Sequence, residues 1–212
     1  MIADYINNFC LDYVKKHVIF AILMIIIGYK FWYKYILISG IVILLFIIYF
    51  FRRPKVNTQR SRNFAVSPAS GKIIKIQERD GLLQIAIFIN LWDAHVQYVP
   101  YNGIVQSQIY KKGQFNAAYL FKKGKDNEKL IHNIRTDRGL MTIVQIAGVV
   151  ARSIEKFVNK GEQVSQNEEL GLIRFGSRCD LFIPVENKFN VLVKEGDRVK
   201  GGITNLIQFF DI

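Results

Sequence analysis

Several residue types and motifs are scarce or missing in this sequence of 212 residues. Its two cysteines, Cys10 and Cys179, lie far apart, so neither a disulfide framework nor a zinc site is indicated. This usage fits a reducing location that faces the cytoplasm. The Walker loop, the dinucleotide glycine fingerprint and the Gly-x-Ser-x-Gly elbow are also missing. Metal-dependent, nucleotide-binding and elbow-type hydrolase functions are therefore disfavoured.

Acidic residues are few relative to basic ones, 17 against 29, which gives a formal net charge of +12. Such a charge needs an anionic partner, either nucleic acid or the surface of an anionic bilayer. A nucleic-acid module would interleave aromatic and basic side chains on one sheet face. That combination occurs only at Lys30-Phe-Trp-Tyr-Lys34, between two apolar runs. The sequence therefore favours the membrane surface and predicts no nucleic acid.

The two apolar runs cover residues 18–29 and 35–51. A complete crossing needs about 20 apolar residues, which the second run nearly reaches. Basic residues flank both ends of the segment, so both ends are expected on the cytoplasmic side of the cell membrane. We expect residues 1–54 to form an anchor of two apolar helices, either a spanning hairpin or a shallow re-entrant one. No small-residue cleavage site follows, so a signal peptide is disfavoured.

Beyond Pro54 the composition changes. Residues 55–63 are polar and basic, as expected of a linker at the lipid headgroups, and residues 64–212 contain short β-like runs separated by glycines. The expected strands are 72–77, 82–89, 103–109, 139–146, 171–175, 180–183 and 189–193. The second domain is therefore predicted to be mostly β.

An internal similarity refines this prediction. Lys160-Gly-Glu-Gln-Val164, followed by 170–173, resembles Glu195-Gly-Asp-Arg-Val199, followed by 205–207. Paired hairpins of this kind resemble biotinyl- and lipoyl-carrier domains, in which two similar halves close a flattened barrel or sandwich. The exposed Met-Lys-Met turn of a carrier is missing, so a carrier function is disfavoured even if the architecture is shared.

Two pairs of residues are candidates for catalytic roles. Asp93 and His95 are two residues apart, which permits a base with an orienting carboxylate if both side chains project from the same face. Gly176-Ser177 joins a small residue to a hydroxyl nucleophile. Taken alone, each pattern is also what a structural histidine or an ordinary turn would show.

In combination, these residues belong to a longer series of motifs. In order, the series is Phe50-Phe-Arg-Arg-Pro54, Ser67-Pro-Ala-Ser-Gly-Lys72, Trp92-Asp-Ala-His-Val-Gln-Tyr-Val-Pro100, Asn102-Gly103, Asn127-Glu128, Val144-Gln-Ile-Ala-Gly148 with Ala151-Arg152, and Gly171-Leu-Ile-Arg-Phe-Gly-Ser-Arg178. It resembles the short form of the phosphatidylserine decarboxylase family over about residues 50–204. The Ile-Arg-Phe-Gly-Ser-Arg stretch is its most specific part.

The resemblance implies a self-cleaving proenzyme. The chain would be cut between Gly176 and Ser177 into residues 1–176 and 177–212, which stay associated, and Ser177 would become a covalent pyruvoyl group. His95 matches the histidine that assists the cut, with Asp93 beside it. The pyruvoyl carbonyl would form a Schiff base with the substrate amine and act as the electron sink, without metal or pyridoxal phosphate. The implied reaction converts phosphatidylserine to phosphatidylethanolamine.

One position departs from the family pattern. Relatives often read Ser-Pro-Ala-Asp-Gly where this chain has Ser67-Pro-Ala-Ser-Gly71, so Ser70 replaces an aspartate proposed to take part in processing. Either Asp93 alone orients His95 or processing is slow. Two alternatives remain open: an archaetidylserine-type decarboxylase, and a non-enzymatic membrane protein with a carrier-like β domain. Oligomeric state and the residues that grip the lipid phosphate are left undetermined.

Overall fold

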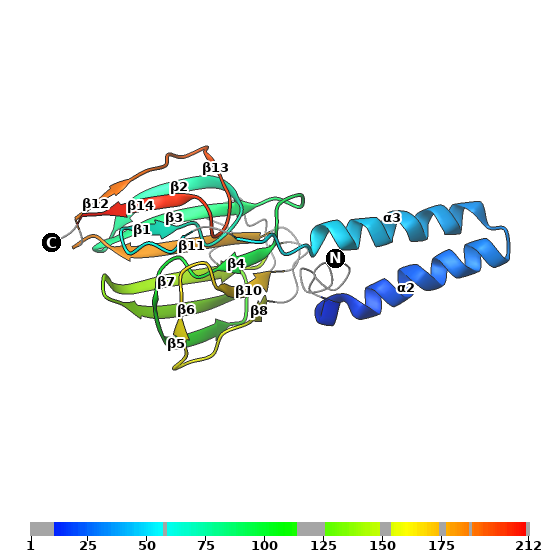
Figure 1. Cartoon of the computed structure of the whole chain (residues 1–212), viewed down its shortest axis with the longest axis horizontal. Helices are drawn as coiled ribbons and strands as arrows, with labels where there is room; N and C mark the ends of the chain where they lie inside the picture. Colours follow the sequence, from blue (N-terminus) through cyan, green and yellow to red (C-terminus); the bar gives the residue numbers. More distant parts are fainter. Residues whose placement is uncertain are drawn as a thin grey trace. The chain divides into compact units, whose positions relative to one another are not determined.

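The computed structural model describes residues 11–56, 59–113, 126–148, 154–173, 177–186 and 188–210, with side chains from Val14 onward. The chain divides into two compact units, Met1–Lys55 and Val56–Ile212. The described part of the first unit is helical, and that of the second is built from strands (Figure 1). The prediction of a mostly β second domain is confirmed.

Helices α2 (Leu11–Lys30) and α3 (Lys34–Phe50) form the first unit. They pack closely at two glycines. A Cβ on Gly28 would lie 2.4 Å from the Leu37 nitrogen, and one on Gly40 would lie 2.9 Å from Ile25 Cγ1. Both distances are too short for any residue with a Cβ, so these glycines allow the two helices to meet.

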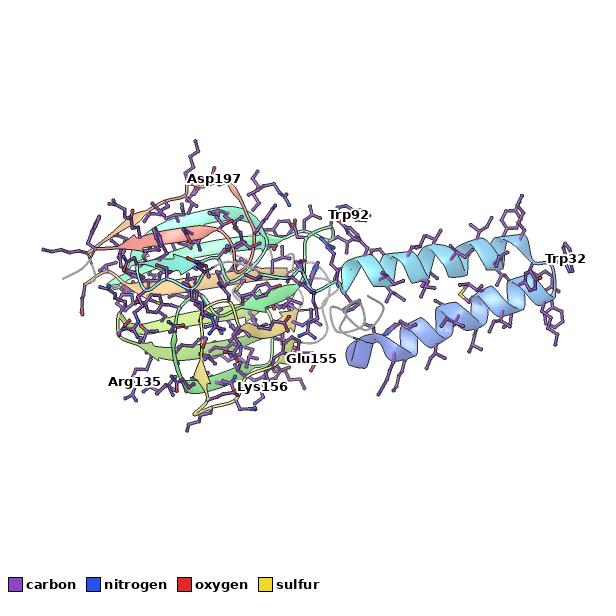
Figure 2. All side chains as sticks on the ribbon, viewed as in Figure 1. Trp32, Trp92, Arg135, Glu155, Lys156 and Asp197 are labelled. Carbon is purple, nitrogen blue, oxygen red and sulfur yellow. The ribbon has the colours of Figure 1, made fainter. Side chains whose placement is uncertain are left out.

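Large apolar side chains cover the outside of this hairpin. More than half of each side chain is exposed at Ile19, Phe20, Ile26, Val42 and Leu45, and the turn carries Trp32 at 92% exposure (Figure 2). Soluble proteins rarely leave an apolar surface of this extent in water. In the described part of the chain, no helix is long and apolar enough to cross a membrane.

The second unit contains fourteen described strands in three sheets. They are β1 (Phe64–Val66), β2 (Gly71–Arg79), β3 (Leu82–Ile89), β4 (Val96–Tyr98), β5 (Gly103–Lys111), β6 (Lys129–Thr136), β7 (Gly139–Ile146), β8 (Ile154–Lys156), β9 (Gln163–Val164), β10 (Glu169–Ile173), β11 (Ser177–Pro184), β12 (Phe189–Val191), β13 (Arg198–Val199) and β14 (Asn205–Phe209). The predicted strands 82–89 and 139–146 are confirmed to the residue.

The largest sheet has eight strands in the order β13-β2-β3-β11-β7-β6-β5-β9. Two three-stranded sheets, β1-β14-β12 and β4-β10-β8, complete the unit. All recorded pairings are antiparallel. Figure 1 shows β11 beside β7 at the centre of the large sheet. The core contains Ile85, Ile87, Ile143 and Leu181 from the central strands of this sheet.

The strand order of the large sheet divides the domain into two equivalent halves, which meet between β11 and β7. Strands β4 to β10 form one half, and β11 to β14 together with β1 to β3 form the other. Each strand has a counterpart of equal length: β2 and β5 have nine residues, β3 and β6 eight, β7 and β11 eight, β10 and β14 five. The halves even share a bulge, after Ile73 in β2 and after Val105 in β5.

This duplication explains the internal similarity seen in the sequence and corrects one part of the prediction. The two similar segments contain β9 with β10 and β13 with β14, but these strands do not form hairpins with each other. β9 pairs with β5, whereas β10 pairs with β4 and β8. Each segment therefore links the large sheet to a small one, and Gly161 and Gly196 occupy equivalent left-handed turns at φ +86° and +97°.

Candidate active site

Ser177 is the first residue of β11, where it pairs with Ile89 at the end of β3. Alternation along the strand puts it on the same face as Cys179 and Leu181, which belong to the core. Its Oγ is completely buried and has no hydrogen-bond partner among the described residues. An unsatisfied buried hydroxyl is costly and rare, so Ser177 is a candidate functional residue. Gly176, the other residue of the predicted cut, lies outside the described residues.

His95 is fully buried in the segment that leads from β3 into β4. Its Nδ1 lies 2.9 Å from the backbone carbonyl oxygen of Asp93. A carbonyl only accepts hydrogen bonds, so Nδ1 carries the ring proton and Nε2 is the basic nitrogen. The histidine therefore has the tautomer that a general base requires.

The backbone joins His95 to the predicted cut. The amide of Ile173, at the end of β10, donates to the His95 carbonyl oxygen over 3.3 Å. Ile173 is the last described residue before the predicted cut, and Ser177 is the first one after it. His95 is thus hydrogen-bonded to the end of β10, four residues before Ser177 in the sequence.

The Asp93 side chain holds the turn that precedes His95. Its Oδ2 accepts from the Asn90 amide at 2.9 Å, and its Oδ1 contacts the Arg198 guanidinium. The Asp93 amide in turn donates to the Asn90 carbonyl oxygen at 2.9 Å. The predicted contact between the two residues therefore runs through the Asp93 backbone carbonyl, while the recorded bonds of its carboxylate fix the turn.

A chain of polar side chains, buried except for the half-buried Gln108, leads away from His95. Gln97 Nε2 donates to the His95 carbonyl oxygen at 2.7 Å, and Gln145 Nε2 donates to Gln97 Oε1 at 2.7 Å. His132 Nε2 donates to Gln145 Oε1 at 2.7 Å, and Gln108 Nε2 donates to His132 Nδ1 at 3.0 Å. The donors all point the same way, toward His95, so the chain holds one fixed arrangement.

Burial lowers the pKa of His132 to about 4, with a hydrogen bond to Gln145 opposing the shift and the charge of Lys156 adding to it. His132 is therefore neutral at physiological pH. The sequence prediction missed this residue, as it missed Gln97 and Gln145 as members of a polar chain. The two glutamines do occur in the family motifs, but they become neighbours only in the tertiary structure, where Gln145 on β7 of the large sheet bonds Gln97 on β4 of a small sheet.

Ser70, which replaces the aspartate of relatives, accepts a hydrogen bond from the Gly201 amide at 3.0 Å. Asn102 occupies the equivalent position in the other half and accepts from the Gln166 amide at 2.7 Å. Both residues precede the glycine that opens β2 or β5. The recorded bond of Ser70 is thus that of a loop cap, which a hydroxyl makes as readily as a carboxylate.

The opposite face of β11 carries a different feature. Arg178 donates to Asp180 through Nε at 2.8 Å and Nη2 at 3.1 Å, and both side chains are almost completely buried. Burial raises the pKa of the Asp180 carboxyl, although Arg178 and Gln84 stabilise its charged form. This pair lines a cavity of about 340 Å³ together with Lys129 and Phe182. Because strand neighbours alternate, the cavity and Ser177 lie on different faces of the sheet.

Proteins of one family resemble this chain over most of its length. The family model described as phosphatidylserine decarboxylase matches residues 43–206. A phosphatidylserine decarboxylase proenzyme of Syntrophus aciditrophicus is 41% identical over 174 residues, covering 78% of this chain and 80% of that protein. A putative archaetidylserine decarboxylase proenzyme of Methanococcoides burtonii is 34% identical over 170 residues, covering 80% and 78%. This chain therefore belongs to the phosphatidylserine decarboxylase family.

Proposed function

We propose that this chain is a phosphatidylserine decarboxylase proenzyme that cuts itself between Gly176 and Ser177. The observation that supports the cut most directly is the buried Ser177 hydroxyl, which has no hydrogen-bond partner in the described structure. A hydroxyl that no neighbour holds is available for reaction with the carbonyl of the residue before it. Membership of the family, whose relatives are described as proenzymes, supports the same reading.

The cut follows from the chemistry of this chain's own residues. His95 Nε2 takes the proton of the Ser177 hydroxyl, which attacks the Gly176 carbonyl carbon and converts the amide bond into an ester. Elimination then removes a proton from the Cα of residue 177 and releases the Gly176 carboxylate, which leaves a dehydroalanine whose enamine takes a proton at Cβ and becomes an imine. Water hydrolyses the resulting imine with loss of ammonia. A pyruvoyl group remains at the new N-terminus of residues 177–212.

The surroundings of Ser177 suit such a group. Its neighbours on the same face of the strand are apolar and buried, so water is kept from a reactive carbonyl. Once formed, the pyruvoyl carbonyl supplies an electron sink for loss of CO₂ from an amino acid. His95, held in one tautomer by the Asp93 carbonyl, is the residue we propose to return a proton to the substrate. The polar chain behind it keeps its backbone in place.

We further propose that residues 1–54 anchor the enzyme at the cell membrane, with the β domain on the cytoplasmic side. The support is the array of exposed apolar side chains along α2 and α3, together with the basic flanks Lys15, Lys16, Arg52 and Arg53. Basic residues near an anionic surface contribute about 1 kcal/mol each. Association with a bilayer would hold the domain where its lipid substrate lies.

Intact-mass analysis of purified protein tests the proposal. We expect two chains, residues 1–176 and 177–212, with a blocked N-terminus on the smaller one. Ser177→Ala should give one uncut chain without decarboxylase activity. Ser107→Ala is a matched control, because Ser107 lies in the other half of the β domain, where its Oγ accepts a hydrogen bond from Asn133. An uncut wild-type chain that releases CO₂ from lipid would refute the proposed maturation.

The lipid backbone needs its own assay, because one relative is described as an archaetidylserine decarboxylase. The cleaved enzyme should be offered the diacyl and the diether serine lipid in the same mixed micelles. We expect faster turnover of the diacyl lipid. The opposite preference would make archaetidylserine the substrate and leave the mechanism unchanged.

A further inference from the structure

The turn that carries the proposed catalytic histidine also exposes two large apolar side chains. Trp92 is 61% exposed and Leu91 is 36% exposed, whereas the three residues that follow, Asp93 to His95, are buried. Figure 2 shows Trp92 on this turn at the edge of the β domain. The apolar tip is therefore only three residues from the base that acts on the substrate.

The exposure is a property of a fixed turn. Asn90 and Asp93 bind each other twice, through the Asp93 amide and the Asn90 carbonyl at 2.9 Å and through the Asn90 amide and Asp93 Oδ2 at 2.9 Å. Arg198 contacts the other carboxylate oxygen. With both ends of the turn held, its fixed backbone directs Leu91 and Trp92 outward. At 61% exposure, Trp92 presents a large apolar surface to the outside of the domain.

Cations border the tip. Arg198 is 64% exposed beside Asp93, and its strand partner Lys72 is exposed as well. Residues paired across strands project to the same face, so these two cations lie together. A tryptophan next to basic residues is the combination found at the interface between lipid headgroups and acyl chains.

We propose that Leu91 and Trp92 insert into the surface of an anionic phospholipid bilayer and hold the active-site turn against it. This rests on the proposed lipid substrate and adds a second membrane contact, separate from the helical anchor, made by the loop that positions His95. Its consequence is that the lipid headgroup reaches the site without leaving the bilayer surface.

The sequence offers a direct test, because the whole chain contains only two tryptophans, Trp32 and Trp92. In the full-length Trp32→Phe protein the fluorescence of Trp92 is observed alone, and in Trp92→Phe that of Trp32. Vesicles of phosphatidylcholine and phosphatidylglycerol, with brominated acyl chains, are added to each. We expect a blue shift and quenching of Trp92, with a smaller response at high salt because the cations are screened. Unquenched Trp92 on vesicles that bind the protein would overturn the inference.

Activity gives a second readout. Trp92→Ala should lower turnover of lipid in vesicles by about tenfold relative to turnover of a dispersed short-chain substrate by the same variant, the scale expected for one large apolar group. Leu140→Ser is the control for Leu91→Ser, because Leu140 is similarly exposed, at 41%, on a different strand. Equal vesicle activity of these two serine variants would count against the inference. Absence of cleavage or of short-chain turnover in the unaltered protein would instead refute the proposed function.

Discussion

The two halves of the β domain share a backbone plan and differ in what fills it. In one half the interior positions on β5, β6, β7 and β4 hold Gln108, His132, Gln145 and Gln97. The register puts Ile76, Ile85, Ile183 and Ala65 at the equivalent positions of the other half. Ile76 pairs with Ile85 just as Gln108 pairs with His132. A polar chain thus replaces an apolar layer, and it ends at the carbonyl of His95.

A glycine makes room for this polar chain. Gly171 pairs with Gln97, and a Cβ there would lie 2.9 Å from Gln145 Nε2. Its counterpart Ile207 pairs with Ala65 and packs in the core.

The two halves also differ in how their central strands are connected. β6 and β7 join through a tight turn between Thr136 and Gly139, whereas β3 and β11 are separated by the whole other half and by the predicted cut. The proposed cut therefore lies in a connection that has no counterpart in the other half.

The largest effect should come from replacing His95, at whose carbonyl oxygen the polar chain ends. We expect His95→Ala to accumulate the full-length chain, with cleavage slowed at least about 100-fold, the usual contribution of a general base. Gel electrophoresis of freshly purified protein over several days measures the rate. His132→Ile is the comparison, since Ile85 occupies the equivalent position in the other half: this variant should still cleave. Normal cleavage of His95→Ala would show that the base lies elsewhere.

The half that contains the polar chain, strands β4 to β10, should also make the stability of the protein sensitive to acid. The folded pKa of His132 lies near 4, below its unfolded value, so the unfolded chain binds the proton first. Its contribution to stability is complete above about pH 6.5 and is lost as the pH falls toward 4, with a total of about 3 kcal/mol. Denaturant unfolding at several pH values measures the slope. His132→Gln should flatten it between pH 6.5 and 4; an unchanged slope would mean that other groups govern acid sensitivity.

A smaller difference between the two halves is expected when the space beside Gln145 is filled. Gly171→Ala puts a methyl group 2.4 Å from the Glu155 carbonyl oxygen, so the strand must shift. Overpacking of this kind costs about 1–3 kcal/mol and should slow cleavage as well. Ile207→Val, at the equivalent position, should cost about 1 kcal/mol and leave cleavage unchanged. Thermal melts and a cleavage time course distinguish the two; equal effects on cleavage would argue against a role for the polar chain.

The smallest effect is expected at Asp93. Asp93→Asn keeps an acceptor for the Asn90 amide and loses the charge that faces Arg198. Because Arg198 is 64% exposed, the ion pair is screened, and cleavage should slow by no more than about fivefold. Arg198→Gln should have a similar effect, and both effects should shrink at high salt. A loss as large as that of His95→Ala would mean that the carboxylate acts on the histidine directly.

The sequence alone determined the mostly β class, the segregation of apolar helices from the β domain, and the family, because alternation, glycine spacing and ordered motifs are local signals. Ser177 and His95 were named in advance for the same reason. Only the tertiary structure decided that the similar segments belong to two interlocked halves, because strand order depends on long-range pairing. It alone showed that His132 and Gln145 support His95, since a buried histidine and a glutamine have no local signature until three strands bring them within hydrogen-bond distance.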